Sequence, residues 1–242
     1  QMCIRDRVFN TSMTGYQEIL TDPSYAGQGV VMSYPLIGNY GVNSEDNESS
    51  RPWVEMLVVR HLSPRGSNFR REMDLGDYMK EHDIPGIEGV DTRALTKLLR
   101  SQGSMNAMLT CAQQFDVGQV LERLHAYKVR DTIQKVTRSA PEEFPAIGEE
   151  RYHVAMMDYG VKQNMIDCLR RRGCSVTALP ASTPAETVLS GGYDGVLLSN
   201  GPGDPAENTD MIREIKKLYD SGLPLYGICL GHQMLALATG AR

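Results

Sequence analysis

The chain has 242 residues, of which 41% are hydrophobic and 23% are charged, and its formal net charge is -5. This composition is typical of a globular protein with one large domain or two ordinary ones. No apolar run approaches the roughly 18 residues that span a bilayer, and no basic and then apolar signal segment opens the sequence. The acidic balance lacks the basic footprint of a nucleic-acid-binding protein. We therefore expect a cytoplasmic protein that binds neither membranes nor nucleic acids.

The five cysteines are odd in number and widely scattered, and no two of them form a Cys-x-x-Cys pair. This pattern argues against a zinc knuckle and against a disulfide framework, so we expect no metal site. Most free cysteines are small buried hydrophobic residues, and we interpret Cys168 and Cys174 in this way. A reducing compartment leaves one other thiol available for chemistry.

The composition divides the chain into two halves. Residues 139–151 contain two prolines and four acidic residues without an apolar period, which is typical of a linker. We expect an N-terminal domain over residues 8–138 and a second domain over residues 152–242. Residues 1–7 fit nothing that follows, and we set them aside as a translated artefact or a tag remnant.

The N-terminal half mixes short strands with helices. Asp91 can cap a helix in which Leu95, Leu98 and Leu99 share one face and after which Gly103 ends the turn. The predicted elements are strands at residues 29–34 and 53–60 and helices at residues 74–82 and 91–102. This half is therefore expected to be a mixed α/β domain.

The C-terminal half alternates strands and helices more regularly. Its predicted strands lie at residues 153–158, 174–179, 193–198 and 223–228, and its predicted helices at residues 162–172, 183–189, 210–219 and 230–238. In the third helix we expect Ile212, Ile215 and Tyr219 to face inward. Such alternation predicts a doubly wound, mostly parallel sheet, in which ligands bind at the carboxyl ends of the strands.

One strand end carries a nucleophile motif. Residues 227–233 read Gly-Ile-Cys-Leu-Gly-His-Gln, directly after an apolar strand and at the start of a helix. A reactive residue between two glycines on a sharp strand-to-helix turn is a nucleophile elbow, here with the thiol of Cys229. The helix N-terminus favours the thiolate form, and the N–H of Leu230 is placed to stabilise an oxyanion. His232 lies on another face of the helix, so we interpret it as a surface or packing residue.

A second strand end carries a rigid glycine turn. Residues 198–205 read Leu-Ser-Asn-Gly-Pro-Gly-Asp-Pro, and the paired glycines and prolines fix an unusual loop that can aim backbone amides at a ligand. Taken alone, the motif is equally consistent with a tight turn. Its position one βαβ step before Cys229 places it beside the elbow and favours a functional interpretation.

Together these two segments resemble the class I glutamine amidotransferases. The N-terminal half narrows the resemblance to the family of carbamoyl-phosphate synthase small subunits. This resemblance extends from about Val8 to Arg242. The segments that carry it are residues 9–25 (Phe-Asn-Thr-Ser-Met-Thr-Gly-Tyr-Gln-Glu-Ile-Leu-Thr-Asp-Pro-Ser-Tyr), residues 34–41 (Tyr-Pro-Leu-Ile-Gly-Asn-Tyr-Gly), residues 67–70 (Ser-Asn-Phe-Arg) and residues 91–93 (Asp-Thr-Arg).

The resemblance implies roles for individual residues. Cys229 resembles the nucleophile that attacks the side-chain amide of glutamine, releasing ammonia and leaving a glutamyl thioester. Backbone donors for the oxyanion and the substrate are implied at Leu230 and in the turn from Gly201 to Gly203. Side chains that bind glutamine are implied at Gln233 and, from the first domain, at Ser24.

The resemblance also implies a substrate and a partner. The substrate is L-glutamine, and the partner is a large synthetase subunit that uses ATP, Mg²⁺ and bicarbonate. No cofactor is expected in this chain, which has no Gly-x-x-x-x-Gly-Lys-[Ser/Thr] loop for ATP. Two alternatives are a glutaminase serving anthranilate, purine or folate synthesis and a non-catalytic assembly subunit on the same fold.

Two parts of the family pattern are not found in this sequence. The base and orienting acid of the family lie in a His-Pro-Glu sequence after the elbow helix, but none of the five histidines here precedes Pro-Glu. Further strands before Phe9 and a glutamine-binding loop after Arg242 are also implied. We therefore expect an incomplete second domain and a polypeptide that is poorly stable and inactive in ammonia release, whereas the full gene product is an enzyme.

Overall fold

A computed structural model describes the backbone of residues 2–241 and the side chains of residues 8–241. The chain forms two compact units that meet between Arg130 and Asp131, and each is described by itself. In the described part of the chain, no helix combines the length and the apolar character that a membrane crossing needs.

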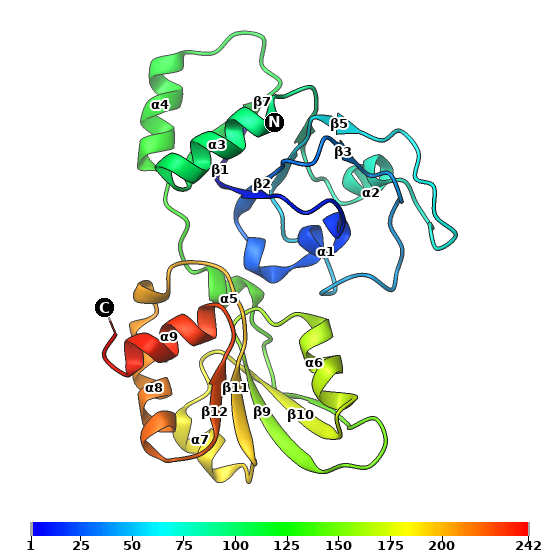
Figure 1. Cartoon of the computed structure of the whole chain (residues 1–242). Helices are drawn as coiled ribbons and strands as arrows, with labels where there is room; N and C mark the ends of the chain where they lie inside the picture. The colour runs from blue at the N-terminus through cyan, green and yellow to red at the C-terminus, as the bar shows by residue number, and fades with distance from the viewer. Residues whose placement is uncertain (1, 242) are drawn as a thin grey trace. The chain divides into compact units, whose positions relative to one another are not determined.

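The N-terminal unit is built on a five-stranded sheet in the order β6-β4-β2-β1-β7 (Figure 1). Four of these strands run parallel, and β7 is antiparallel to β1. The sheet strands are β1 (Met2–Asn10), β2 (Gln28–Met32), β4 (Met56–Val58), β6 (Gly86–Ile87) and β7 (Met105–Thr110), and a small separate sheet pairs β3 (Leu36–Ile37) with β5 (His61–Leu62). The helices are α1 (Tyr16–Thr21), α2 (Leu75–Glu81), α3 (Thr92–Gln102) and α4 (Val117–Ala126), with the short 3-10 helix η1 (Pro23–Tyr25) after α1.

The side chains of β2 alternate between the two faces of this sheet. Val30 and Met32 pack into the larger core with residues of α1 and α2, whereas Val31 packs on the opposite face against Leu99 of α3. The predicted start of α3 is confirmed, because the side chain of Asp91 accepts a hydrogen bond from the N–H of Ala94 at 3.0 Å. The inward face is narrower than expected, since Leu98 is 37% exposed.

Residues 1–7 were set aside in the sequence analysis, but residues 2–7 are part of β1. The backbone of Met2 to Arg7 pairs with β7, and the backbone of Asp6 to Asn10 pairs with β2. Within β1, only Asp6 and Arg7 pair with both neighbouring strands, and these backbone pairings do not require an alternating side-chain pattern. A strand of this kind leaves no period-two pattern to recognise, which is why it was missed.

The C-terminal unit has a second five-stranded sheet in the order β12-β11-β9-β10-β8 (Figure 1). All pairs are parallel except β8 with β10. The strands are β8 (Glu142–Phe144), β9 (Tyr152–Asp158), β10 (Cys174–Pro180), β11 (Gly195–Leu198) and β12 (Leu225–Gly227). The helices are α5 (Thr132–Val136), α6 (Gln163–Arg170), α7 (Ala185–Ser190), α8 (Thr209–Asp220) and α9 (Leu230–Ala238), with the 3-10 helix η2 (Pro205–Glu207) before α8.

Helices cover both faces of this sheet. On one face, Met156 of β9 packs with Ile166 of α6. On the other face, Met157 packs into a core shared with α5, α7, α8 and α9. The predicted doubly wound α/β architecture is therefore confirmed. The inward face of α8 was partly wrong, since Tyr219 is 52% exposed and Leu218 is buried in its place.

The segment expected as a linker contains structure of its own. Within residues 139–151, strand β8 pairs with β10 through Phe144 and Val176. Before it, Ile133 of α5 is fully buried in the core of the C-terminal unit. The division of the chain therefore falls earlier than residue 139. The segment resembled a linker because a short edge strand needs few apolar residues and its acidic sequence looks like that of a loop.

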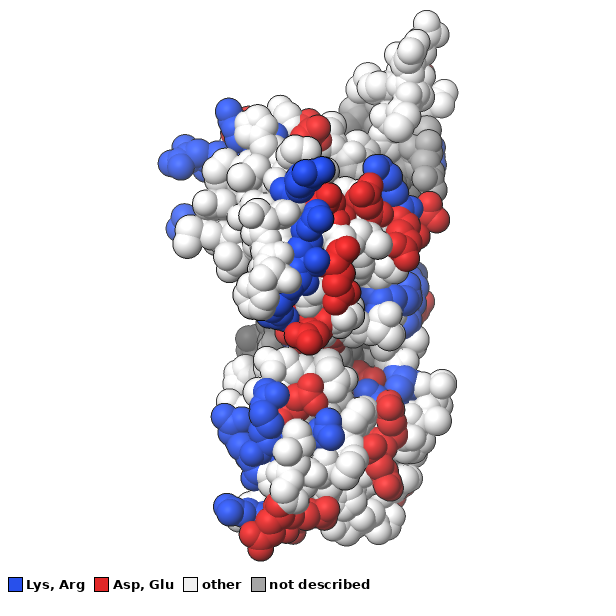
Figure 2. All heavy atoms as spheres, turned by 90° about the vertical axis from the view of Figure 1, so that its right-hand side faces the viewer, with Lys and Arg blue, Asp and Glu red and all other residues white. Residues whose placement is uncertain are grey.

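Charged side chains of both signs are interspersed on the face of the molecule drawn in Figure 2. Among the described residues, ion pairs join Arg71 to Asp74 at 2.7 Å and Lys217 to Glu214 at 2.9 Å. Residues 8–241 contain no group of three or more His, Cys, Asp or Glu side chains that could hold a metal ion.

Candidate active site

Cys229 occupies the sharp turn between β12 and α9. It is the N-cap of α9, and its φ of 52° and ψ of -113° place a non-glycine residue in a backbone region that side chains rarely adopt. The residue is exposed. This is the geometry of a nucleophile elbow, which pushes one side chain out from a tight strand-to-helix connection.

The two flanking glycines are required by close backbone contacts. A Cβ atom on Gly227 would lie 2.6 Å from the N atom of His232, and a Cβ atom on Gly231 would collide with the carbonyl oxygen of Leu198. Helix α9 therefore starts directly against the carboxyl ends of β11 and β12. Any larger residue at either position would move the helix start away from the sheet.

Backbone hydrogen bonds fix the helix start. The N–H of Ile228 donates to the carbonyl oxygen of Leu198, and the N–H of Gly231 donates to the carbonyl oxygen of Ser199, both at 3.0 Å. The N–H of Leu230 has no acceptor among the described residues, while its side chain is 1% exposed. An unpaired N–H next to the thiol is the donor that an oxyanion hole needs.

The glycine turn lies against the elbow. A Cβ atom on Gly201 would lie 2.9 Å from a side-chain methyl of Leu230 and would collide with the carbonyl oxygen of Tyr159. Gly203 has a φ of 94°, which favours glycine. The structure therefore brings together Cys229, Leu230 and the Gly201–Gly203 turn, four positions that the sequence analysis singled out.

Gln233 and His232 lie on the first turn of α9, and both are exposed. The N–H of Gln233 closes the turn on the carbonyl oxygen of Cys229 at 3.0 Å. Within the described residues, no histidine side chain is hydrogen-bonded to the thiol of Cys229. His232 is therefore a surface residue in this structure, as expected.

Ser24 lies in the N-terminal unit, on the 3-10 helix η1. Its N–H donates to the side chain of Asp22 at 2.8 Å, so a buried carboxylate caps this short helix. Thr21, which precedes the capping residue Asp22, connects this segment to a neighbouring loop. Its hydroxyl accepts from the N–H of Glu48, and its carbonyl oxygen accepts from the hydroxyl of Ser49.

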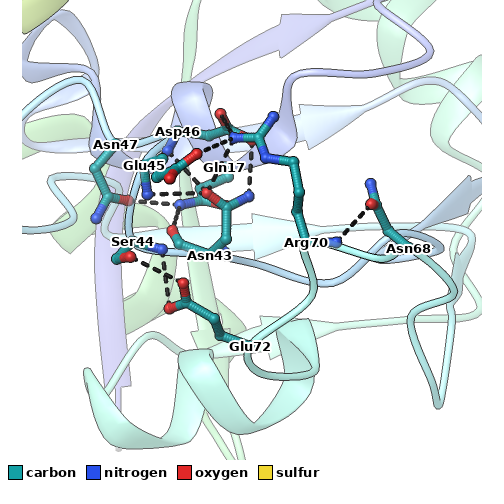
Figure 3. Close-up of polar contacts among 9 residues, drawn as sticks. All are labelled: Gln17, Asn43, Ser44, Glu45, Asp46, Asn47, Asn68, Arg70 and Glu72. Atoms are coloured by element: carbon teal, nitrogen blue, oxygen red, sulfur yellow. Dashed lines mark hydrogen bonds and ion pairs between the residues drawn. The ribbon is translucent and has the colours of Figure 1, made fainter.

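A polar network holds the loop that contacts Thr21 (Figure 3). Gln17 is 1% exposed, and its amide donates to the carbonyl oxygen of Asn43 and accepts from the N–H of Asn43. Arg70 reaches Asp46 and lies 3.2 Å from Glu45. A hydrogen bond from the Asn43 amide and the neighbouring Arg70 guanidinium lower the pKa of Asp46. No local sequence pattern predicts the contacts of Gln17 with Asn43 or of Arg70 with Asn43 and Asp46, because these partners are 24 to 27 residues apart.

The other cysteines divide differently from the expectation. Cys174 is 8% exposed, and burial raises the pKa of its thiol, as befits a structural residue. Cys168 was expected to be buried but is only half-buried, with its sulfur 3.5 Å from the guanidinium of Arg171. It lies on the polar side of α6, whereas Ile166 occupies the position of that helix that faces the core.

Two residues near the glycine turn were missed by the sequence analysis. Thr132 donates to the carbonyl oxygen of Pro202 at 3.2 Å, and Asp158 accepts from the N–H groups of Gly160 and Val161 at 3.0 and 2.9 Å. Asp158 ends a strand next to the glycine-bearing segment, which was a usable signal. Thr132 is 70 residues from its partner and gave none.

Comparison with known proteins finds family matches in both halves of the chain. Residues 2–109 match the family described as carbamoyl-phosphate synthase small chain, CPSase domain, and residues 155–242 match glutamine amidotransferase class-I. The carbamoyl phosphate synthase small chain of Clostridium perfringens is 46% identical over 99% of this chain and 67% of that protein.

Two further relatives carry the same description. The protein of Pseudomonas syringae is 46% identical over 97% of this chain and 67% of its own length, and that of Pectobacterium atrosepticum is 45% identical over 100% and 68%. The chain thus spans about two thirds of the length of these curated relatives. With both halves matched in order, the chain belongs to the family of carbamoyl phosphate synthase small chains and carries a class I glutamine amidotransferase domain.

Proposed function

We propose that this chain carries the nucleophile that hydrolyses glutamine to glutamate and ammonia, and that the ammonia passes to a large synthetase subunit. The observation that carries the proposal is the exposed Cys229, held at a φ of 52° on the N-terminus of α9. Strained backbone at an exposed thiol is costly, and it persists where the surrounding contacts serve a reactive group. The family membership supports the same reaction.

The first half of the reaction forms a thioester. The sulfur of Cys229 attacks the amide carbon of the glutamine side chain, and the negative charge moves to the amide oxygen. The N–H of Leu230, which has no acceptor among the described residues, is free to donate a hydrogen bond to that oxygen. When the C–N bond breaks, the nitrogen takes up a proton and leaves as ammonia.

The second half releases glutamate. Water attacks the thioester carbon, the C–S bond breaks, and the thiol of Cys229 is regenerated with a proton from that water. Both halves need a group that moves protons at the sulfur and at the leaving nitrogen. Among the described residues no histidine side chain is hydrogen-bonded to the thiol of Cys229, and we assign this role to none of them.

The substrate-binding groups in this proposal are those that the family resemblance implies. They are the backbone groups of Gly201 and Gly203, the exposed amide of Gln233 and the hydroxyl of Ser24. The large subunit uses ATP, Mg²⁺ and bicarbonate, and its product is carbamoyl phosphate for pyrimidine or arginine synthesis, or both. No cofactor is assigned to this chain.

Labelling of the full gene product with the chloroketone analogue of glutamine tests the proposal. We expect alkylation of Cys229, located by peptide mass spectrometry, and slower alkylation when free glutamine is present. Cys229→Ser is expected to abolish this labelling, whereas Cys111→Ser is the matched control because Cys111 is also an exposed thiol. Equal reaction at Cys111 and Cys229, without protection by glutamine, would refute a glutamine site and favour an assembly role for the fold.

A further inference from the structure

Helix α5 lies outside both ranges that match known families, since residues 110–154 fall between them. It is nevertheless part of the core of the C-terminal unit, where Ile133 is fully buried in the same hydrophobic cluster as Leu198 and Leu230. A short helix in the core that also contains the strand before the glycine turn and the residue after the nucleophile is placed to influence both. Its polar contacts show how.

Thr132, at the start of α5, contacts the glycine turn directly. Its hydroxyl donates to the carbonyl oxygen of Pro202 at 3.2 Å, and the side chain is 7% exposed. The same hydroxyl fills the space that a Cβ atom on Gly203 would need. The middle peptide of the turn is therefore held by one buried side chain that lies 70 residues earlier in the chain.

The other end of α5 contacts the segment at Gly160, which lies against the glycine turn. Val136 lies 3.1 Å from the position of a Cβ atom on Gly160, and Gly160 in turn lies against Gly201. Just beyond the helix, Arg138 pairs with the buried carboxylate of Asp158 at 2.9 Å. That carboxylate accepts from two N–H groups of the Gly160 segment, so α5 and its extension fix both segments that meet at Gly201.

We propose that α5 is a clamp on the substrate-binding turn and that Thr132 is a positioning residue for glutamine. The inference rests on the proposed function, because it assigns the Gly201–Gly203 turn to the substrate. Without the hydroxyl, the Pro202 carbonyl loses its buried donor and the peptide from Pro202 to Gly203 is free to rotate. A rotated peptide presents its N–H to the substrate in the wrong direction.

The test compares three variants by the concentration dependence of labelling with the glutamine chloroketone. Thr132→Val keeps the shape but removes the hydroxyl, Thr132→Ser restores it, and Thr137→Val is the matched control. Thr137 lies just after the same helix, and its hydroxyl accepts from the N–H of Ala181 at 2.9 Å, away from the turn. We expect about a five-fold or larger loss of apparent affinity in Thr132→Val, recovery in Thr132→Ser and little change in Thr137→Val.

Two further measurements separate positioning from folding and from the proposed function. Alkylation of Cys229 by iodoacetamide, which does not use the substrate site, is expected to be unchanged in Thr132→Val. Amide hydrogen exchange in residues 200–204 is expected to be faster in Thr132→Val than in Thr137→Val. Equal labelling and equal exchange in these two variants would overturn the clamp while leaving the proposed function intact. These variants are compared in the full gene product, and failure of the unmodified full gene product to label would overturn the proposed function and the clamp with it.

Discussion

The two units hold their candidate site segments by different means. In the C-terminal unit, the elbow at Cys229 is shaped by backbone atoms in contact, and Gly227 and Gly231 are small because carbonyl and amide groups fill the space a side chain would need. In the N-terminal unit, the segment that carries Ser24 is capped by the side chain of Asp22, and the loop beside Thr21 is held by side-chain hydrogen bonds from residues such as Gln17. The backbone contacts at the elbow leave no space for an additional side-chain atom. The network in the N-terminal unit depends instead on polar groups that hydrogen-bond to one another.

This difference predicts how each site fails. Steric contacts between backbone atoms leave no room to relax, so a single added methyl group is expected to displace a whole helix. A polar network fails when one partner is removed, because the remaining buried groups lose their hydrogen bonds. Mutations matched between the two units can therefore separate the two kinds of support.

The largest effect is expected for Gly231→Ala. The new Cβ atom collides with the carbonyl oxygen of Leu198, and relief requires α9 to move off the sheet. We expect the C-terminal unit to lose at least about 3 kcal/mol of unfolding free energy and Cys229 to lose its selective labelling. Protection of the buried thiol of Cys174 against a thiol reagent, measured across a urea series, reports on this unit.

The matched control for this mutation is Gly76→Ala, in helix α2 of the N-terminal unit. A Cβ atom there would make an ordinary contact at 3.6 Å with the side chain of Leu62. Because alanine has a higher helix propensity than glycine, we expect a stabilisation of about 0.5 to 1 kcal/mol. If Gly231→Ala were equally harmless, the elbow would not depend on the close contact.

A second, smaller effect is expected for Gln17→Leu. The substitution keeps a buried side chain of similar size but leaves the N–H and carbonyl oxygen of Asn43 without their partner. We expect a loss of about 2 to 3 kcal/mol from the N-terminal unit. Fluorescence of Trp53, the one tryptophan of the chain, follows this unit, and its indole N–H bonds to Ser49 of the same loop at 2.9 Å.

Gln119→Ala provides the comparison, because Gln119 is exposed on helix α4. A change of less than about 0.5 kcal/mol is expected there. An equally small effect of Gln17→Leu would mean that the network in Figure 3 adds no support to the Ser24 segment.

The sequence allowed more of the C-terminal unit to be predicted than of the N-terminal unit, and the same contrast explains why. Alternating apolar periods place the strands and helices, and the glycines around Cys229 mark the elbow, so helix α9 was predicted at its observed bounds. Strand β7 and helix α1 lack such periods and were not predicted. The contacts of Gln17 and Thr132 join residues far apart in sequence, and only the fold brings those residues together.

The smallest effect concerns charge, and it tests whether polar support also matters within the C-terminal unit. Glu214 of α8 accepts a hydrogen bond from the N–H of Ala185 at the start of α7, at 2.7 Å, and pairs with Lys217. These two contacts, the backbone bond first, lower the pKa of the carboxyl group below its ordinary value. Its charged form is therefore favoured by folding. The resulting stability is fully present above the unfolded pKa of about 4.3 and is lost as the pH falls through the folded pKa.

Glu214→Gln keeps an oxygen that can accept from Ala185 but removes the charge. At pH 7 we expect a loss of less than about 1 kcal/mol, because the group is partly exposed and its ion pair is screened. The difference from the unmodified chain should shrink as the pH falls below about 4.3 and vanish once the carboxyl group is protonated in the folded state. Urea unfolding of the C-terminal unit at a series of pH values measures this difference, with Glu149→Gln as an exposed control in the same unit. A difference that stayed constant with pH would show that the charge of Glu214 does not stabilise the contact between α7 and α8.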